Sequence, residues 1–190
     1  WQQELVSALF GKVGCDGNRQ YKVVWLEAPR KAGKTTLAAA LMLYMLLVDE
    51  EQGAEIAICS STTASANVCL NIARQMVESN ADMSSVCSVR SKSISYKNNH
   101  ARLASASSLR GADLSMAIID DVQYVTQMDL HETLTLCMAA RRNPIILYLA
   151  SAGSQGALGW DLHRHACSIR KGQTRDPRWL VRIYGAARED

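Results

Sequence analysis

The chain has 190 residues, of which 48% are apolar and 21% charged, and its formal net charge is +3. This length fits one domain that buries around 70% of the surface exposed by its unfolded chain. The six cysteines contain no C-x-x-C pair and mostly lie in apolar stretches, which argues against a disulfide framework or zinc site and favours reduced thiols in a cytosolic protein. No stretch reaches the ~18 apolar residues of a membrane span, so we expect no membrane partner.

The chain begins with a predicted helix and a predicted strand that lead into a cationic loop. Residues Trp1–Phe10 carry apolar side chains at a helical period, and Tyr21–Leu26 is a β-branched and aromatic run typical of a buried strand. The loop Ala28–Thr36 follows, and then Leu37–Val48 provides twelve consecutive apolar residues, a length typical of a buried core helix. This order is typical of a phosphate-binding loop, although Ala28 stands where the pattern G-x-x-x-x-G-K-[ST] begins with glycine.

The charge around this loop supports an anion-binding role. Arg30, Lys31 and Lys34 crowd a predicted helix start, and no acidic residue lies between Glu27 and Asp49. A helix start carries roughly half a positive charge and unpaired N–H groups, so cations there repel one another unless an anion binds among them. A polyphosphate bound to the loop amides would supply that anion. The alternative is a solvated basic turn before a core helix.

The residue types in the loop predict distinct contacts with a nucleotide. Gly33 permits close approach of the backbone, Lys34 reaches the β- and γ-phosphates, and Thr35 offers its hydroxyl to Mg²⁺. The sequence therefore predicts ATP and Mg²⁺ as ligands, with Lys34 also acting in catalysis. The predicted phosphate-binding residues are Arg30, Lys31, Ala32, Gly33, Lys34, Thr35 and Thr36.

The rest of the chain alternates buried strands with helices. Predicted strands lie at Glu55–Ser60, Val86–Val89, Ser93–Tyr96, Arg102–Ala104, Met116–Ile119, Ile145–Ala150 and Trp179–Tyr184. Predicted helices lie at Ala64–Glu78, Asp129–Arg141 and Leu158–Arg170. This alternation predicts an α/β fold with a mostly parallel sheet covered on both faces. With the phosphate loop, it indicates a P-loop NTPase (RecA-like, ASCE), a three-layer sandwich formed by a single domain over residues 1–190.

Two adjacent acids close the predicted strand Met116–Ile119. A nucleotide hydrolase needs such acids across from its phosphate loop, and the carboxyl end of a strand places them in the crevice where α/β proteins bind ligands. Asp120 is predicted to hold Mg²⁺ through water, and Asp121 to orient or deprotonate the attacking water. The alternative is a structural role, because Asp commonly opens a turn or caps a helix.

Two further segments are candidates for the same site. Ser151–Gly153 follows the strand Ile145–Ala150 and lies near the γ-phosphate if that strand neighbours Tyr21–Leu26; otherwise it is a plain strand-to-helix turn. Arg110 lies in a glycine-containing loop eleven residues before Asp121. It is either a solvated surface arginine or an arginine finger aimed at the nucleotide of a neighbouring subunit.

An ordered set of motifs covers nearly the whole chain. It comprises Trp1-Gln2, Phe10-Gly11, Asp16–Arg19, Pro29–Thr35, Ser107–Gly111, Ile118–Asp121 and Ser151–Gly153. In this order the motifs resemble those of the N-terminal ATPase domain of tailed-bacteriophage large terminase subunits, the motors that package DNA into procapsids. That family favours a Pro-Arg-Lys-x-Gly-Lys loop in place of a standard Walker A sequence, and this chain matches it.

The resemblance implies a role for each matched residue in nucleotide binding. Arg30 and Lys34 would contact the phosphates, and Thr35 and Asp120 would serve the metal. Gln2 stands where the family is thought to contact adenine.

It also implies roles that reach beyond one subunit. Arg110 matches the arginine that such motors insert into the site of the adjacent subunit. Ser151, Ala152 and Gly153 match the coupling segment that relays hydrolysis to movement. The expected partners are double-stranded DNA, further copies of the chain in a ring, the portal protein and the small terminase subunit, and the expected location is the host cytoplasm, with transient docking on the procapsid portal.

The basic C-terminal part of the chain is compatible with DNA contact. Residues 141–190 hold nine Lys and Arg against four acids, a balance of +5, so the first 140 residues sum to −2. This distribution suits contact with a polyanion, and it suits an ordinary solvated surface almost as well.

Two departures from the family pattern bear on activity. The family usually has Glu at the catalytic position, and the Asp121 side chain is shorter by one carbon–carbon bond, roughly 1.5 Å. A displacement of about 1 Å can cost around a hundredfold in rate, so slow but real hydrolysis is expected. Full-length terminases also carry a C-terminal nuclease domain, which we expect to be absent from these residues; the chain begins at Trp1 and is expected to be one domain of a longer polypeptide.

Two other functions stay open from the sequence. One is a helicase-like or other RecA-like ATPase unconnected with packaging, although no helicase motif beyond Ser151–Gly153 is found. The other is a nucleotide-binding module that no longer hydrolyses ATP and serves in assembly, which the Asp at position 121 keeps open.

Overall fold

The computed structural model describes residues 1–49, 51–105, 111–125, 129–151 and 158–185. The strands are β1 (Val23–Glu27), β2 (Glu55–Ser60), β3 (Cys87–Arg90), β4 (Ser93–Tyr96), β5 (Arg102–Ser105), β6 (Leu114–Asp120), β7 (Ile145–Ala150) and β8 (Trp179–Ile183). The helices are α1 (Gln2–Gly11), α2 (Lys34–Leu47), α3 (Thr63–Glu78), α4 (Ala81–Val86), α5 (Leu130–Cys137) and α6 (Leu158–Arg170), with a 3₁₀ turn, η1 (Val122–Tyr124).

The described strands form one eight-stranded sheet in the order β3-β4-β5-β2-β6-β7-β1-β8. The six strands from β5 to β8 in this order pair in parallel, and β3 and β4 extend the sheet by antiparallel pairing. β1 lies between β7 and β8, with Glu27 opposite Ala150, so the condition under which Ser151 lies near the phosphate loop is met. The carboxyl ends of β1, β6 and β7 therefore meet at one edge of the sheet.

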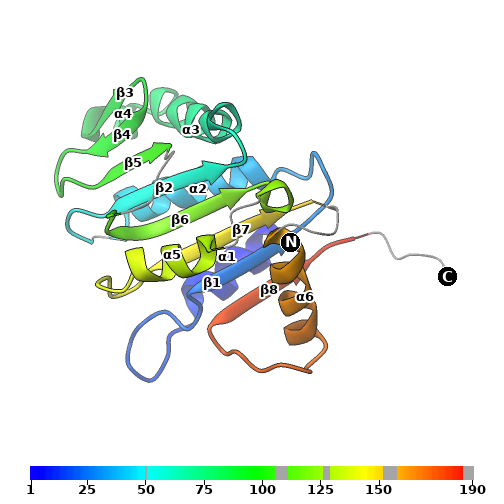
Figure 1. The fold of residues 1–190 in the computed structure, drawn as a ribbon. Coiled ribbons are helices and arrows are strands. Elements are labelled where there is room, and N and C mark those ends of the chain that lie inside the picture. The colour runs from blue at the N-terminus through cyan, green and yellow to red at the C-terminus, as the bar shows by residue number, and fades with distance from the viewer. Residues whose placement is uncertain (50, 106–110, 126–128, 152–157, 186–190) are drawn as a thin grey trace.

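Helices cover both faces of the sheet and enclose two cores. Side chains alternate along each strand, so Val24 and Leu26 of β1 enter one core while Val23 and Trp25 enter the other. The first core is closed by α1, α2 and α3, and the second by α5 and α6, which lie on the near side of the sheet in Figure 1. The predicted three-layer α/β sandwich is confirmed. No helix in the described ranges is long and apolar enough to cross a membrane.

The structure corrects the prediction at two helices. The helix expected over Asp129–Arg141 ends at Cys137, because the chain turns at residues 138–140 and Arg141 donates to Asp113 Oδ1 and Gly53 O, both at 3.0 Å. The short α4 was not predicted. It begins after Asn80, whose Oδ1 accepts a hydrogen bond from Met83 N at 3.0 Å. This N-cap stabilises the start of a helix of only six residues.

Candidate functional site

The loop between β1 and α2 turns through two residues with left-handed backbone. Lys31 has a φ of 65° and Gly33 a φ of 85°. Ala28, at the position where the pattern expects glycine, is 3% exposed and is not among the described residues with positive φ. A buried methyl group therefore fits at position 28, because the backbone there does not need the freedom of glycine.

The Lys34 side chain lies on the floor of this loop. Lys34 is 7% exposed, and its Nζ donates to Ala28 O at 2.7 Å, to Pro29 O at 3.0 Å and to Ser151 Oγ at 3.1 Å. These three contacts match the three donors of an ammonium group. Burial lowers the pKa of Lys34, and the nearby carboxylates oppose that shift. The ammonium thus lies between the loop and the end of β7.

Asp120 ends β6 opposite the start of α2. Its Oδ2 accepts a hydrogen bond from Thr35 Oγ1 at 3.1 Å, and its Oδ1 accepts one from Asp121 N at 3.0 Å. Asp120 is 8% exposed, and burial raises its pKa, with the charge of Asp121 adding to the rise. A buried carboxylate beside a second carboxylate gains stability when a cation binds next to it.

The Asp121 side chain is held by Gln123, two residues further along the chain. Asp121 has left-handed backbone, with a φ of 53° and a ψ of 47°, which Asp tolerates better than most residues. Its Oδ1 accepts a hydrogen bond from Gln123 Nε2 at 2.9 Å, and Gln123 Oε1 accepts one from Ser151 N at 3.2 Å. A chain of hydrogen bonds therefore runs from the second acid to the end of β7.

Arg30 projects from the exposed side of the loop. Its Nη2 donates to Tyr124 Oη at 2.6 Å, and the Tyr124 side chain is 48% exposed. This contact joins the loop to η1 across the mouth of the site. A guanidinium at this position can bind a phosphate oxygen through two parallel N–H bonds.

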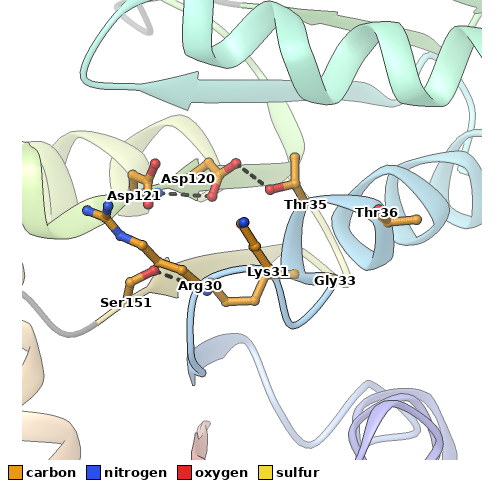
Figure 2. Close-up of a pocket in the computed structure, with 9 residues that line it drawn as sticks. Arg30, Lys31, Gly33, Thr35, Thr36, Asp120, Asp121 and Ser151 are labelled. Carbon is orange, nitrogen blue, oxygen red and sulfur yellow. Dashed lines mark hydrogen bonds between the residues drawn. The ribbon is translucent and has the colours of Figure 1, made fainter.

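These side chains line a single pocket of about 550 Å³. Figure 2 shows the carboxylates of Asp120 and Asp121 facing the loop that carries Lys31 and Gly33. The lining residues are Arg30, Lys31, Gly33, Lys34, Thr35, Thr36, Asp120, Asp121 and Ser151. Cations and backbone amides thus face carboxylates across a space that can hold a polyphosphate.

The pocket offers hard oxygen ligands for Mg²⁺. Thr35 Oγ1 and Asp120 Oδ2 lie 3.1 Å apart at the pocket wall. No cluster of three or more His, Cys, Asp or Glu in the described part of the chain could hold a metal alone. Mg²⁺ commonly keeps several waters and uses one or two carboxylates plus substrate phosphates, so this oxygen pair fits it.

The structure places most of the predicted residues together, and three lie outside its described ranges. The Gln2 amide nitrogen would be 3.3 Å from a Cβ built on Gly33, so Gln2 lies beside the loop. Ala32 belongs to the loop, where its N–H donates to Pro29 O at 3.3 Å, but it does not line the pocket. Nothing is described for Arg110, Ala152 and Gly153.

Sequence reasoning missed Gln123 and Tyr124, which both contact predicted site residues. They directly follow the two acids, and this adjacency was the available signal. The contacts themselves depend on the 3₁₀ turn after β6 and on the pairing of β6 with β7.

Comparison with a protein-family model gives a match over most of the chain. The model described as terminase large subunit, ATPase domain, matches residues 1–162. No protein of curated function matches the chain by sequence.

Several solved structures share the fold. The large terminase of bacteriophage HK97 matches with a TM-score of 0.82 at 20% identity, over 100% of this chain and 40% of that one. The large terminase of a thermophilic bacteriophage, in complex with ATP-gamma-S, matches with a TM-score of 0.67 at 11% identity, over 96% of this chain and 43% of that one. The ATPase domain of the Thermus phage P74-26 large terminase matches with a TM-score of 0.57 at 17% identity, over 70% of this chain and 61% of that one. The chain thus spans less than half the length of the first two of these proteins, and likeness at these identities concerns the fold.

Proposed function

Because the chain belongs to the family of terminase large subunit ATPase domains, we propose that it hydrolyses ATP with Mg²⁺ to drive double-stranded DNA into a viral procapsid. The observation that carries this proposal is the pocket in which the cationic loop faces Asp120 and Asp121. The two sides have the charges that a phosphoryl-transfer site needs, cations for the phosphates and acids for the metal and the water.

The loop is proposed to bind the triphosphate. Lys34 would exchange its contacts with Ala28 O and Pro29 O for phosphate oxygens, since both carbonyls lie on the same loop. Arg30 would turn from Tyr124 to a second phosphate contact. The start of α2 would add backbone amides from Thr35 and Thr36, and Lys31 and Gly33 border the same space.

Gln2 is proposed to contact the adenine. Its amide nitrogen lies beside Gly33, which lines the pocket. An amide offers both a donor and an acceptor, which is what the edge of adenine presents.

Thr35 and Asp120 are proposed to hold Mg²⁺, Asp120 through water. The metal would neutralise part of the negative charge that develops on the phosphates. Asp120 stabilises the bound cation because its carboxylate is buried and lies beside Asp121.

Asp121 is proposed to orient and deprotonate the attacking water. Asp121 and Lys34 line the same pocket. Because Asp is shorter by roughly 1.5 Å than the Glu that the family usually has, we expect hydrolysis to be slow but measurable.

The wider assembly is proposed from family membership. The motor would act as a ring on the portal in the host cytoplasm, together with the small terminase subunit, and Arg110 of one subunit would complete the site of the next. Ser151, Ala152 and Gly153 would couple hydrolysis to DNA movement. The contact of Ser151 Oγ with Lys34 Nζ supports this role, because it joins the segment to the phosphate site.

One observation favours a second candidate, a nucleotide-binding module without turnover. The residue at position 121 is Asp, whose carboxylate reaches roughly 1.5 Å less far toward an attacking water than the Glu that the family usually has. This module would bind ATP as tightly as the proposed motor and serve in assembly.

Steady-state ATP turnover separates these functions. We expect activity with Mg²⁺ that is lost in EDTA, and a loss of roughly 10²- to 10³-fold in kcat for Asp121→Asn with little change in nucleotide binding. Lys34→Ala should weaken both binding and turnover, while Lys92→Ala, an exposed change between β3 and β4, serves as the control. Binding without any Mg²⁺-dependent turnover would favour the module, and unchanged turnover in Asp121→Asn would remove Asp121 from the mechanism.

A further inference from the structure

Gln123 is a buried amide with a hydrogen bond at each end. The residue is 6% exposed. Its Nε2 donates to Asp121 Oδ1 at 2.9 Å, and its Oε1 accepts from Ser151 N at 3.2 Å. The partners fix the orientation of the amide, because an ionised carboxylate can only accept and a backbone N–H can only donate.

We propose that Gln123 is a positioning residue that sets the carboxylate of Asp121 for hydrolysis. This inference rests on the proposed function and adds a residue to it. An Asp side chain can rotate about two torsions, so the carboxylate needs an external contact to keep one direction. The bond from Gln123 holds one carboxylate oxygen and leaves the other for a water.

The backbone of Gln123 is itself fixed by the close approach of α6. A Cβ built on Gly159 would lie 2.7 Å from Gln123 Cα and 2.7 Å from Val122 O. Such distances leave no space between α6 and the backbone of η1, so the Gln123 backbone cannot shift toward α6. Side chains locked by packing and by further hydrogen bonds are the kind of support that keeps a reactive group in place.

The amide also links Asp121 to Ser151 at the end of β7. Ser151 donates its N–H to Gln123, and its Oγ accepts from Lys34 Nζ at 3.1 Å. Ser151 thus contacts the lysine of the phosphate loop and, through Gln123, the acid. A shift at the end of β7 would move Gln123 and with it the Asp121 carboxylate.

The test is the ATP kinetics of Gln123→Glu and Gln123→Met in the full chain. Glu keeps an acceptor for Ser151 N but cannot donate to Asp121, whereas Met removes both bonds at similar size. We expect kcat to fall at least about tenfold in both variants, with KM for ATP within about threefold of the parent value. Nucleotide binding should change little because the hydrogen bonds of the Gln123 side chain go to Asp121 and Ser151 and not to the phosphate loop itself.

Asn99→Asp is the matched control. Asn99 is also 6% exposed, its Nδ2 donates to Glu51 O at 3.3 Å, and its Oδ1 accepts from Ala101 N at 3.0 Å. None of these residues lines the pocket, so this variant should lower the thermal unfolding temperature without changing kcat or KM.

The outcomes separate the inference from the proposed function. Parental kcat in a folded Gln123→Glu or Gln123→Met variant, beside an inactive Asp121→Asn, overturns the role of Gln123 alone. A fall in kcat that Asn99→Asp reproduces at equal loss of thermal stability overturns it too. Parental turnover in Asp121→Asn overturns the proposed catalytic acid as well.

Discussion

The two walls of the pocket are built from the chain in different ways. The loop wall is the continuous segment Ala28–Thr36, which runs from the end of β1 into the first turn of α2. The acid wall joins Asp120–Tyr124, at the end of β6 and in η1, to Ser151, which follows β7 and lies 28 residues beyond Gln123 in the chain. The backbone of η1 packs against Gly159 of α6. The loop wall is therefore set by local backbone geometry, whereas the acid wall depends on how three distant segments pack.

This difference gives the two walls different roles in the proposed reaction. The loop wall presents cations and amides whose place is fixed by the turn between a strand and a helix. The acid wall presents a carboxylate whose direction is fixed by side-chain hydrogen bonds, which a small change can shift. We expect changes in the loop wall to alter nucleotide binding, and changes in the acid wall to alter the rate of hydrolysis.

The largest effect is expected from lengthening the acid. Asp121→Glu extends the carboxylate by roughly 1.5 Å toward the pocket, and we expect kcat for ATP to rise roughly ten- to hundredfold if reach limits hydrolysis. KM should change little, because the loop wall is untouched. Asp82→Glu, the same extension at an exposed residue of α4, is the control in the same turnover assay. An unchanged or lower kcat in Asp121→Glu would show that Asp121 is already placed at its working distance.

A smaller effect is expected at the packing contact behind the acid wall. In Gly159→Ala the new methyl meets the backbone of Gln123, so we expect the free energy of unfolding to fall by about 1–3 kcal/mol, as in overpacked cores. The rate of ATP hydrolysis should fall as well, because Gln123 must move. Urea unfolding and steady-state turnover measure the two effects.

Gly11→Ala is the matched change for this prediction. Gly11 ends α1, and a Cβ built on it meets nothing within 4 Å, so alanine should leave activity unchanged and raise stability by up to about 1 kcal/mol. Equal stability for the two alanine variants would mean that α6 and η1 can separate without cost.

The same contrast explains what the sequence could predict. The loop wall was predictable because strand, loop and helix follow one another in the sequence, and the left-handed residues Lys31 and Gly33 that shape the turn lie within this one segment. Asp120 and Asp121 were predictable as acids closing a buried strand. The hydrogen bonds of Gln123 were not, because they require the left-handed turn at Asp121 and the pairing of β6 with β7.

The error at the end of α5 has a similar origin. The sequence pattern favoured a helix up to Arg141, but α5 ends at Cys137 and the Arg141 side chain donates to Gly53 O and to Asp113 on other segments. These partners lie 88 and 28 residues away in the chain, beyond the reach of helical periodicity.

The smallest effect is expected at the position where the loop departs from the standard pattern. Ala28→Gly restores the first glycine, yet Ala28 is not among the described residues with positive φ, so kcat and KM for ATP should stay within about twofold of the parent values. The free energy of unfolding should fall by roughly 0.5–1 kcal/mol, because glycine adds freedom to the unfolded chain and a buried methyl is lost.

The reverse change within the same loop, Gly33→Ala, should raise KM for ATP. A φ of 85° is unfavourable for alanine, and the new methyl would lie 3.3 Å from the Gln2 amide nitrogen. If Ala28→Gly improved kcat/KM as much as Gly33→Ala impaired it, the first glycine would serve the phosphates directly, and local backbone geometry would not be what sets the loop wall.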